Sequence, residues 1–262
     1  MSDFKDCFAL VTGASQGLGR AFAVELAKRG FNIILVSLPD EALPEVAHNL
    51  RKQFGVKVAC YESDLTVHEN LLAFGNWVNL NFDVFLLINN AGKGGSQSFI
   101  EASAEYLNSI IQLNVKVTSL LTHQLLPNLL RQEKAFVLNV SSLAAFTPLG
   151  YKTVYPASKV FVDYFSRGLK EELKKTGVMV SVVHPGAMKT NSEIIRRIHK
   201  QGLMAKLCLQ TPERVAAASL NRILLNKKQI SVNPVSSFVL KIIPLWIRLP
   251  LLSNIIKREL QS

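Results

Sequence analysis

Short apolar runs rich in β-branched residues alternate along the chain with longer amphipathic stretches, and this alternation limits the fold more than any other feature of the sequence. The apolar runs have the length of strands, and the stretches between them have helical periodicity. Strands separated by helices form βαβ units, so the sequence predicts an α/β fold with a doubly wound parallel sheet of about seven strands and helices on both faces. The predicted strands are 8–13, 32–37, 57–62, 83–90, 135–142 and 178–184, and the predicted helices are 16–29, 40–54, 66–80, 103–131 and 154–175.

A chain of 262 residues with 48% hydrophobic and 19% charged residues is typical of a folded globular protein. We expect one domain over residues 1–237 and a separate apolar, basic tail over residues 238–262. The cysteines, Cys7, Cys60 and Cys208, are odd in number and far apart, which suits neither a disulfide framework nor a metal cluster. With no signal-peptide pattern in MSDFKDCFAL, we expect a cytoplasmic protein. The histidines also show no ligand spacing, so we expect that no metal is needed.

The net charge of +11 is concentrated in the last quarter of the chain. Residues 1–188 carry a net charge of +1, whereas residues 189–262 carry +10. A nucleic-acid groove recruits basic residues along a whole domain, so a local anionic partner fits this distribution better.

The segment TGASQGLG at 12–19 follows the first predicted strand and opens the first predicted helix. A turn in this place directs backbone N–H groups and the positive end of a helix at a pyrophosphate, and glycine lets the backbone approach closely. The alternative is an ordinary tight turn. The gap between Gly13 and Gly17 also differs from the commoner G-x-G-x-x-G spacing.

Tyr155 and Lys159 are one helical turn apart in a predicted helix. A phenol has an ordinary pKa of about 10, and a nearby ammonium lowers that pKa by favouring the phenolate. Ser142 ends a predicted strand, at the edge where open α/β sheets bind ligands, and its hydroxyl would polarise a carbonyl oxygen beside the tyrosine. The alternative is that Tyr155 and Lys159 form only the half-exposed rim of a helix.

Several motifs occur together in one order: TGASQGLG (12–19), NNAG (89–92), Asn114, Ser142 before YPASK (155–159), and HPGAMKT (184–190). Together they resemble the short-chain dehydrogenases/reductases over residues 7 to 190. The resemblance implies a single-domain Rossmann-type fold, a nicotinamide cofactor, a homodimer or homotetramer, and a substrate loop at about 187–210. It also implies hydride transfer between the nicotinamide and a carbonyl carbon, with Tyr155 as general acid/base.

The resemblance assigns roles to particular residues. Asn114, Ser142, Tyr155 and Lys159 form the implied catalytic set, in which Lys159 holds the nicotinamide ribose and Asn114 helps a proton relay. For Asn114 the alternative is an interhelical hydrogen bond, and for His184 we favour a structural place at a strand end. Besides Tyr155 and Lys159, the implied cofactor-binding residues are Gly13, Ser15, Gln16, Gly17, Leu18, Gly19, Ser37, Asp64, Leu65, Asn90, Ala91, Gly92, Pro185, Gly186, Met188 and Thr190.

The choice between NAD and NADP depends on the end of the second predicted strand. NAD-preferring enzymes carry an acid there, which holds the adenosine ribose and repels a 2′-phosphate. This chain has Ser37, which does not exclude a phosphate, although Gln16 and Leu38 stand where NADP-preferring relatives carry basic residues. We therefore expect NADP(H) to be favoured, with NAD(H) as the alternative.

The tail is apolar, but Lys241, Pro244, Arg248 and Pro250 interrupt it, so it suits a membrane span poorly. Two interpretations stay open: it lies peripherally on an anionic membrane surface, or it packs over its own substrate pocket or a partner subunit. Acyl carrier protein is another acidic partner that fits the charge. Either way we expect an apolar pocket and a lipophilic ketone substrate, such as a 3-oxoacyl chain or a steroid. The alternative function is a non-catalytic dinucleotide sensor or scaffold.

Overall fold

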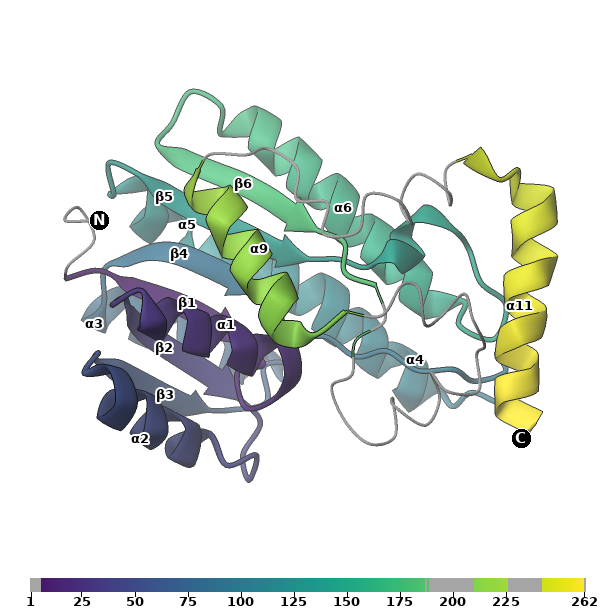
Figure 1. Cartoon of the computed structure of the whole chain (residues 1–262), viewed down its shortest axis with the longest axis horizontal. Coiled ribbons are helices and arrows are strands. Elements are labelled where there is room, and N and C mark those ends of the chain that lie inside the picture. Colours follow the sequence, from purple (N-terminus) through teal and green to yellow (C-terminus); the bar gives the residue numbers. More distant parts are fainter. Residues whose placement is uncertain (1–5, 187, 189–209, 226–241, 262) are drawn as a thin grey trace.

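The computed structural model describes residues 6–186, 188, 210–225 and 242–261. Within these residues six strands form one parallel sheet in the order β3-β2-β1-β4-β5-β6 (Figure 1). In the register of the sheet, Leu10 of β1 lies opposite Ile34 of β2 and Leu87 of β4. The strands are β1 (Phe8–Thr12), β2 (Asn32–Ser37), β3 (Val58–Glu62), β4 (Val84–Asn89), β5 (Ala135–Val140) and β6 (Val178–Val183).

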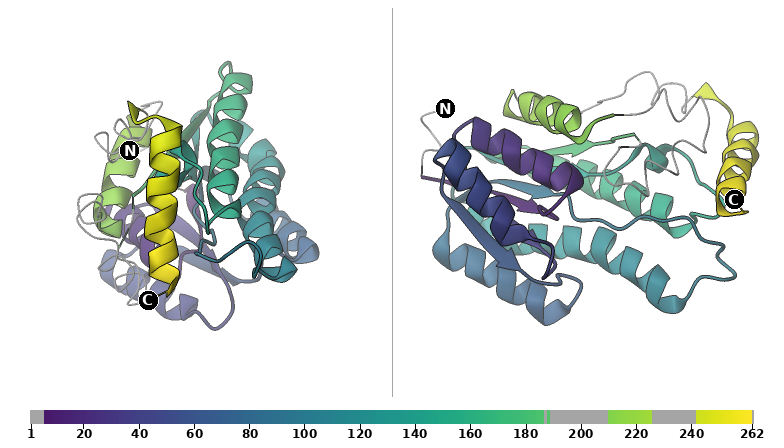
Figure 2. Two further views of the ribbon diagram at one scale, coloured as in Figure 1. Left: turned by 90° about the vertical axis from the view of Figure 1, so that its right-hand side faces the viewer. Right: turned by 60° about the horizontal axis from the view of Figure 1, so that its bottom comes forward.

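Helices cover both faces of the sheet, because each strand presents alternate side chains to opposite sides. Ala9 and Val11 of β1 join the core under α1 (Gly17–Lys28), α2 (Leu43–Phe54) and α9 (Pro212–Leu224). Leu10 joins the other core, under α3 (His68–Asn81), α5 (Thr118–Leu130) and the carboxyl end of α6 (Val154–Glu172) (Figure 2). The predicted doubly wound α/β architecture is therefore confirmed.

The predicted helix at 103–131 is three segments rather than one. It begins as α4 (Ala104–Ile111), continues through a π-helical segment (Gln112–Val117) and ends as α5. A π-helical segment carries an extra residue in one turn and is found most often at functional sites. The periodicity of apolar residues does not reveal one extra residue inside a long helix, so this feature was missed.

The helix predicted at 40–54 also begins later, at Leu43. Asp40 and Ala42 have left-handed backbones, with φ of 63° and 55°, so the chain turns here before it becomes helical. Pro44 then stands in the first turn of the helix, where proline is favourable.

The described part of the tail is one helix, α11 (Leu245–Gln261), which includes Pro250. It lies beyond the carboxyl ends of the strands in both views (Figures 1 and 2). The backbone N–H of Gly150 donates to Ser253 Oγ at 2.8 Å, and Ile256 is buried. In the parts of the chain that the structure describes, no helix combines the length and hydropathy needed to cross a membrane.

Some predictions fall on residues that the structure does not describe. These are the boundary at 237–238, Thr190, Cys208, and the predicted substrate loop at 187–210 apart from Met188 and Gln210.

Candidate active site

A crevice is expected where β1 and β4 lie side by side, because the chain leaves these strands toward opposite faces of the sheet. Side-chain hydrogen bonds hold the two strand ends together there. The hydroxyl oxygen of Thr12 accepts from the backbone N–H groups of Asn90 and Ala91, at 3.0 and 2.8 Å. In return, the Asn90 amide donates to the carbonyl oxygens of Thr12 and Gly13, at 2.8 and 3.2 Å.

The glycine-rich turn leaves the start of α1 open to a ligand. Gln16 precedes the helix and makes no side-chain hydrogen bond to its first N–H groups, so no side chain competes for them. A side chain at Gly19 would collide with the carbonyl group of Gly13 and with the Asn90 amide. The free helix end and the tight backbone are the features that a pyrophosphate group requires, so the turn fits a dinucleotide.

Tyr155 stands near the start of α6, with its side chain only partly exposed. Ser142 lies just after β5 and lines the same cleft as Tyr155, and its hydroxyl acts to lower the pKa of the phenol. Ser142 Oγ also accepts from the backbone N–H of Ala144 at 3.1 Å, which fixes the serine at the start of a short 3-10 turn. Ser141, by contrast, is buried and donates to the carbonyl oxygen of Lys159 at 2.8 Å. Of the two serines, Ser142 is therefore the one beside the phenol.

Lys159 is 5% exposed, and its ammonium donates to the carbonyl oxygen of Val140 at 2.9 Å. Its Nζ lies 5.9 Å from the centre of the Tyr155 ring. A side chain at Gly92 would come within 3.2 Å of this Nζ, so only glycine leaves the space around the ammonium free. Burial disfavours the charged form and lowers the pKa of Lys159 to about 8.

Burial also raises the pKa of Tyr155, and the hydrogen bond from Ser142 offsets this only in part. The spacing of Tyr155 and Lys159 predicts that the ammonium lowers that pKa below its ordinary value. In the structure, removal of the phenol from water raises that pKa instead. Tyr155 is therefore a neutral phenol at pH 7, which is the state of a proton donor.

Asn114 is fully buried in the π-helical segment. Its amide oxygen accepts from the backbone N–H of Lys93 at 2.8 Å. Its amide nitrogen donates to the Lys93 carbonyl and to Ser158 Oγ, both at 2.9 Å. Asn114 thus joins the segment after β4 to the first turns of α6, which is close to the interhelical alternative considered for it.

One cleft brings together most of the residues expected around the nicotinamide. Tyr155, Lys159 and Ser142 line it beside Lys93 and Gly94, which the sequence analysis did not single out. The cleft is also lined by Leu18, Asn90, Gly92, Pro185, Gly186 and Met188.

At the expected adenosine end, the polar side chains of Ser37 and Asp64 make hydrogen bonds to their own neighbours in the chain. The hydroxyl of Ser37 is buried and donates to the Leu38 carbonyl at 3.1 Å. The carboxylate of Asp64 accepts from the N–H and the hydroxyl of Thr66, at 2.9 and 2.7 Å, so it stabilises its own turn. Leu65, beside it, is buried.

The buried carboxylate of Asp163 lies between the side chains of His184 and Arg167. His184 Nε2 is 3.0 Å from Asp163 Oδ1, and Arg167 Nε is 3.0 Å from the other carboxylate oxygen. Burial by itself raises the pKa of Asp163, but hydrogen bonds from His184 and Arg167 together outweigh it and lower that pKa. The ring of Phe146 packs on His184 with 4.7 Å between centroids. His184 therefore has the structural place expected for it, next to the Pro185–Gly186 turn.

Comparison with known proteins decides the family. The model of the short chain dehydrogenase family matches residues 8–218. The chain belongs to this family.

Relatives and solved structures agree with that assignment. The chain is 35% identical over 194 residues to a very-long-chain 3-oxoacyl-CoA reductase of Anas platyrhynchos, and the match covers 72% of the chain and 62% of that relative. A short-chain dehydrogenase of Sphingobium yanoikuyae solved with NADPH has 29% identity and a TM-score of 0.78, over 87% of this chain and 89% of the other. A bulky-bulky ketone specific alcohol dehydrogenase of Comamonas testosteroni has 27% identity and a TM-score of 0.78, over 88% of each chain.

Three further residues of this short-chain dehydrogenase contribute to the site without a clear sequence signal. Asp163 is one helical turn beyond Lys159, so a carboxylate on the buried face of a helix was the available signal. Lys93 contributes backbone groups, which its residue type does not reveal. Glu41 accepts a hydrogen bond from Ser15 Oγ at 2.6 Å across a loop, and no local pattern predicts that contact.

We predict that Asp163→Asn lowers the free energy of unfolding at pH 7 by about 1–3 kcal/mol, because it removes one partner of a buried pair. The folded-state pKa of Asp163 is lowered, so its stabilising effect is present above the ordinary carboxyl range and is lost as pH falls through the folded pKa. Urea unfolding at pH 7 and at successively lower pH measures this effect.

The matched control is Glu171→Gln on the same helix, whose carboxylate is 72% exposed and pairs with Lys174. Exposed pairs contribute less than about 1 kcal/mol. Equal destabilisation by the two variants, or a loss for Asp163→Asn that does not shrink at low pH, would contradict the assignment.

Proposed function

We propose that this short-chain dehydrogenase reduces the ketone of a lipophilic 3-oxoacyl substrate, with a nicotinamide dinucleotide as the hydride donor. One observation carries the proposal: the hydroxyls of Tyr155 and Ser142 share a cleft with the buried ammonium of Lys159, directly beside the glycine-rich turn. A neutral phenol, a second hydroxyl and a cation at one point are what a carbonyl oxygen needs as it becomes an alkoxide.

The residues of the chain divide the reaction between them. A bound reduced nicotinamide supplies the hydride to the carbonyl carbon. Tyr155 gives its proton to the carbonyl oxygen, while Ser142 donates a hydrogen bond to the same oxygen. Lys159 stabilises the phenolate that remains and, as the family resemblance implies, holds the nicotinamide ribose. Asn114 keeps the Lys93 segment and Ser158 in place through the bonds described above, and its part in a proton relay stays a prediction.

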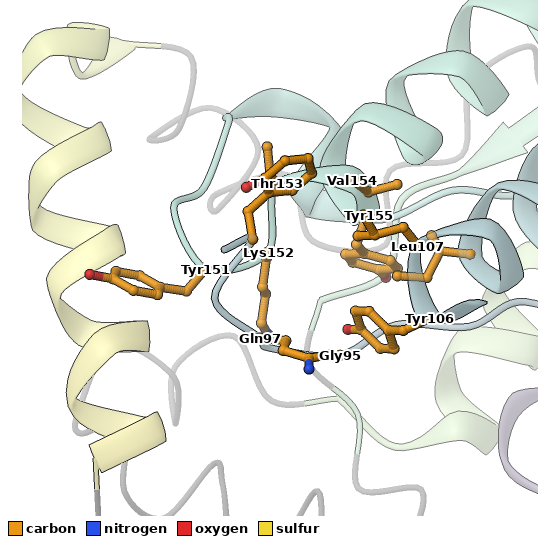
Figure 3. A pocket seen from close by; sticks show the side chains of 11 residues that line it. Gly95, Gln97, Tyr106, Leu107, Tyr151, Lys152, Thr153, Val154 and Tyr155 are labelled. Carbon is orange, nitrogen blue, oxygen red and sulfur yellow. The ribbon is translucent and has the colours of Figure 1, made fainter. Parts of the chain in front are cut away.

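The wall of the pocket beside Tyr155 supports a lipophilic substrate. Tyr106 and Leu107 come from α4, and Val154 comes from the first turn of α6 (Figure 3). Ile110 and Phe99 add further apolar surface, while Gln97, Lys152 and Thr153 add polar groups at the same pocket. Such a wall suits an acyl chain, and the similarity to a 3-oxoacyl-CoA reductase favours the 3-oxoacyl class over a steroid.

The free helix end, the glycine-rich turn and the cleft fit a nicotinamide dinucleotide, and the solved relative from Sphingobium yanoikuyae binds NADPH. The sequence analysis favoured NADP(H) because Ser37 would donate to a 2′-phosphate. The Ser37 hydroxyl faces the Leu38 carbonyl instead, so this argument for NADP(H) is weakened.

A non-catalytic sensor or scaffold is the second candidate. Such a protein needs the glycine-rich turn but has no use for an acid group at the other end of the cleft. Tyr155, Ser142 and Lys159 all line one cleft, which favours the enzyme.

The two interpretations of the tail apply to different sides of α11. Its inner side packs on the protein, where Ser253 bonds to Gly150 and Tyr151 points toward the helix (Figure 3). Its outer side exposes Leu251, and Lys257 and Arg258 are exposed toward its carboxyl end. We infer that the inner side closes one end of the substrate pocket and that the outer side faces an anionic partner, a membrane surface or acyl carrier protein. A homodimer or homotetramer is likewise proposed from the family resemblance.

We predict that Tyr155→Phe lowers kcat by about 10²–10⁴-fold, the usual contribution of general acid catalysis, and leaves dinucleotide binding intact. The change removes only the hydroxyl that holds the transferred proton. Nicotinamide absorbance with a 3-oxoacyl thioester measures turnover, and calorimetry measures binding.

Tyr164→Phe is the matched control, because Tyr164 is on the same helix and is 70% exposed. We expect it to retain full activity. Undiminished turnover in the Tyr155 variant would refute the proposed mechanism, and absence of turnover in the unchanged protein with every ketone tested would favour the sensor.

We also predict that kcat/KM for 3-oxoacyl substrates rises with chain length until the pocket is filled. Burial of one methylene contributes about 0.8 kcal/mol, or about a fourfold increase in kcat/KM. The series is measured with coenzyme A and acyl carrier protein thioesters of equal chain length, so that preference for the carrier is separated from preference for the chain. A preference for short, polar ketones would rule out the lipophilic pocket.

A further inference from the structure

The loop after β2 folds back onto the glycine-rich turn. Ser15, in that turn, is buried, and its hydroxyl donates to the carboxylate of Glu41 at 2.6 Å. Asp40 and Ala42, on either side of Glu41, both have left-handed backbones. Left-handed backbones on both sides of Glu41 bend the loop sharply there, and its carboxylate reaches the turn.

The end of β2 and the glycine-rich turn are the places where a Rossmann-type fold contacts the adenosine ribose, and an acid there holds the ribose hydroxyls. Ser37 occupies the usual position of that acid, and its hydroxyl is committed to the Leu38 carbonyl. The carboxylate beside the turn comes from Glu41, four residues further along the chain.

The charge around this corner is negative. The segments that form it, 12–19, 37–42 and 63–67, contain Asp40, Glu41 and Asp64 but neither lysine nor arginine, and the nearest basic residue along the chain is the exposed Arg20 of α1. A 2′-phosphate brings further negative charge and needs cationic or N–H donors to replace its water. A carboxylate already bound to Ser15 offers it repulsion instead, whereas a ribose with free hydroxyls can donate hydrogen bonds to that carboxylate.

We propose that Glu41 is the residue that selects the unphosphorylated adenosine ribose, so that this short-chain dehydrogenase prefers NAD(H) to NADP(H). This inference rests on the proposed dinucleotide-dependent function and reverses the preference expected from the sequence. Glu41 acts as an acceptor for the ribose hydroxyls, and Ser15 holds its carboxylate in place.

Binding of two fragments without nicotinamide tests the adenosine end alone. Calorimetry compares ADP-ribose with its 2′-phosphorylated form on the full chain. We expect the unchanged protein to bind ADP-ribose at least about tenfold more tightly, since like charges in contact are strongly unfavourable. Glu41→Gln keeps the shape but removes the charge, so it should bring the two dissociation constants to within about threefold of each other.

The control is Glu45→Gln, which removes an equal charge from the exposed first turn of α2 and should leave the ratio unchanged. Equal or tighter binding of the 2′-phosphorylated fragment by the unchanged protein overturns the role of Glu41 while leaving the dinucleotide site standing. A ratio that falls equally in both variants also overturns it, because the effect is then general electrostatics. Failure of both fragments to bind overturns the dinucleotide site and the proposed function with it.

Discussion

The site depends on one buried cation. Removing an ammonium from water is costly unless a hydrogen-bond acceptor replaces the lost solvent, and the carbonyl oxygen of Val140 does so for Lys159. Val140 is the last residue of β5, and Lys159 is in the second turn of α6. This contact therefore fixes the helix against the carboxyl end of the sheet. Tyr155, one turn earlier, is placed over Ser142 by the same contact, and Gly92 leaves room for the ammonium.

The two ends of the crevice have separate tasks in this account. At the reacting end, burial raises the pKa of Tyr155 and keeps the phenol protonated, whereas it lowers the pKa of Lys159 to about 8 and brings the ammonium closer to losing its proton. At the adenosine end, the bond between Ser15 and Glu41 holds a fixed negative charge. The hydrogen bonds between Thr12 and Asn90 lie between these ends and hold β1 and β4 together.

Features that depend on local periodicity were predictable from the sequence. The strand predicted at 32–37 and the helix that begins at Gly17 match the structure closely, because an apolar run and a glycine-rich turn determine the backbone conformation of their own segment. The π-helical segment around Asn114 was not predictable, since one extra residue in a turn leaves the apolar pattern nearly unchanged. Nor was the Ser15–Glu41 contact, which depends on how a loop bends back rather than on spacing along the chain. The expected lowering of the Tyr155 pKa failed because spacing shows which groups are close but not how much water surrounds them.

Titration of the Lys159 ammonium is the most direct test of the central claim that the site is organised around a buried cation. Lysine labelled with ¹³C at Cε reports the ionisation by NMR, and the signal missing from Lys159→Met assigns the residue. The account predicts a pKa of about 8, because burial disfavours the charged form. A pKa at the ordinary lysine value of about 10.4 would show that the ammonium is solvated, and would contradict the account.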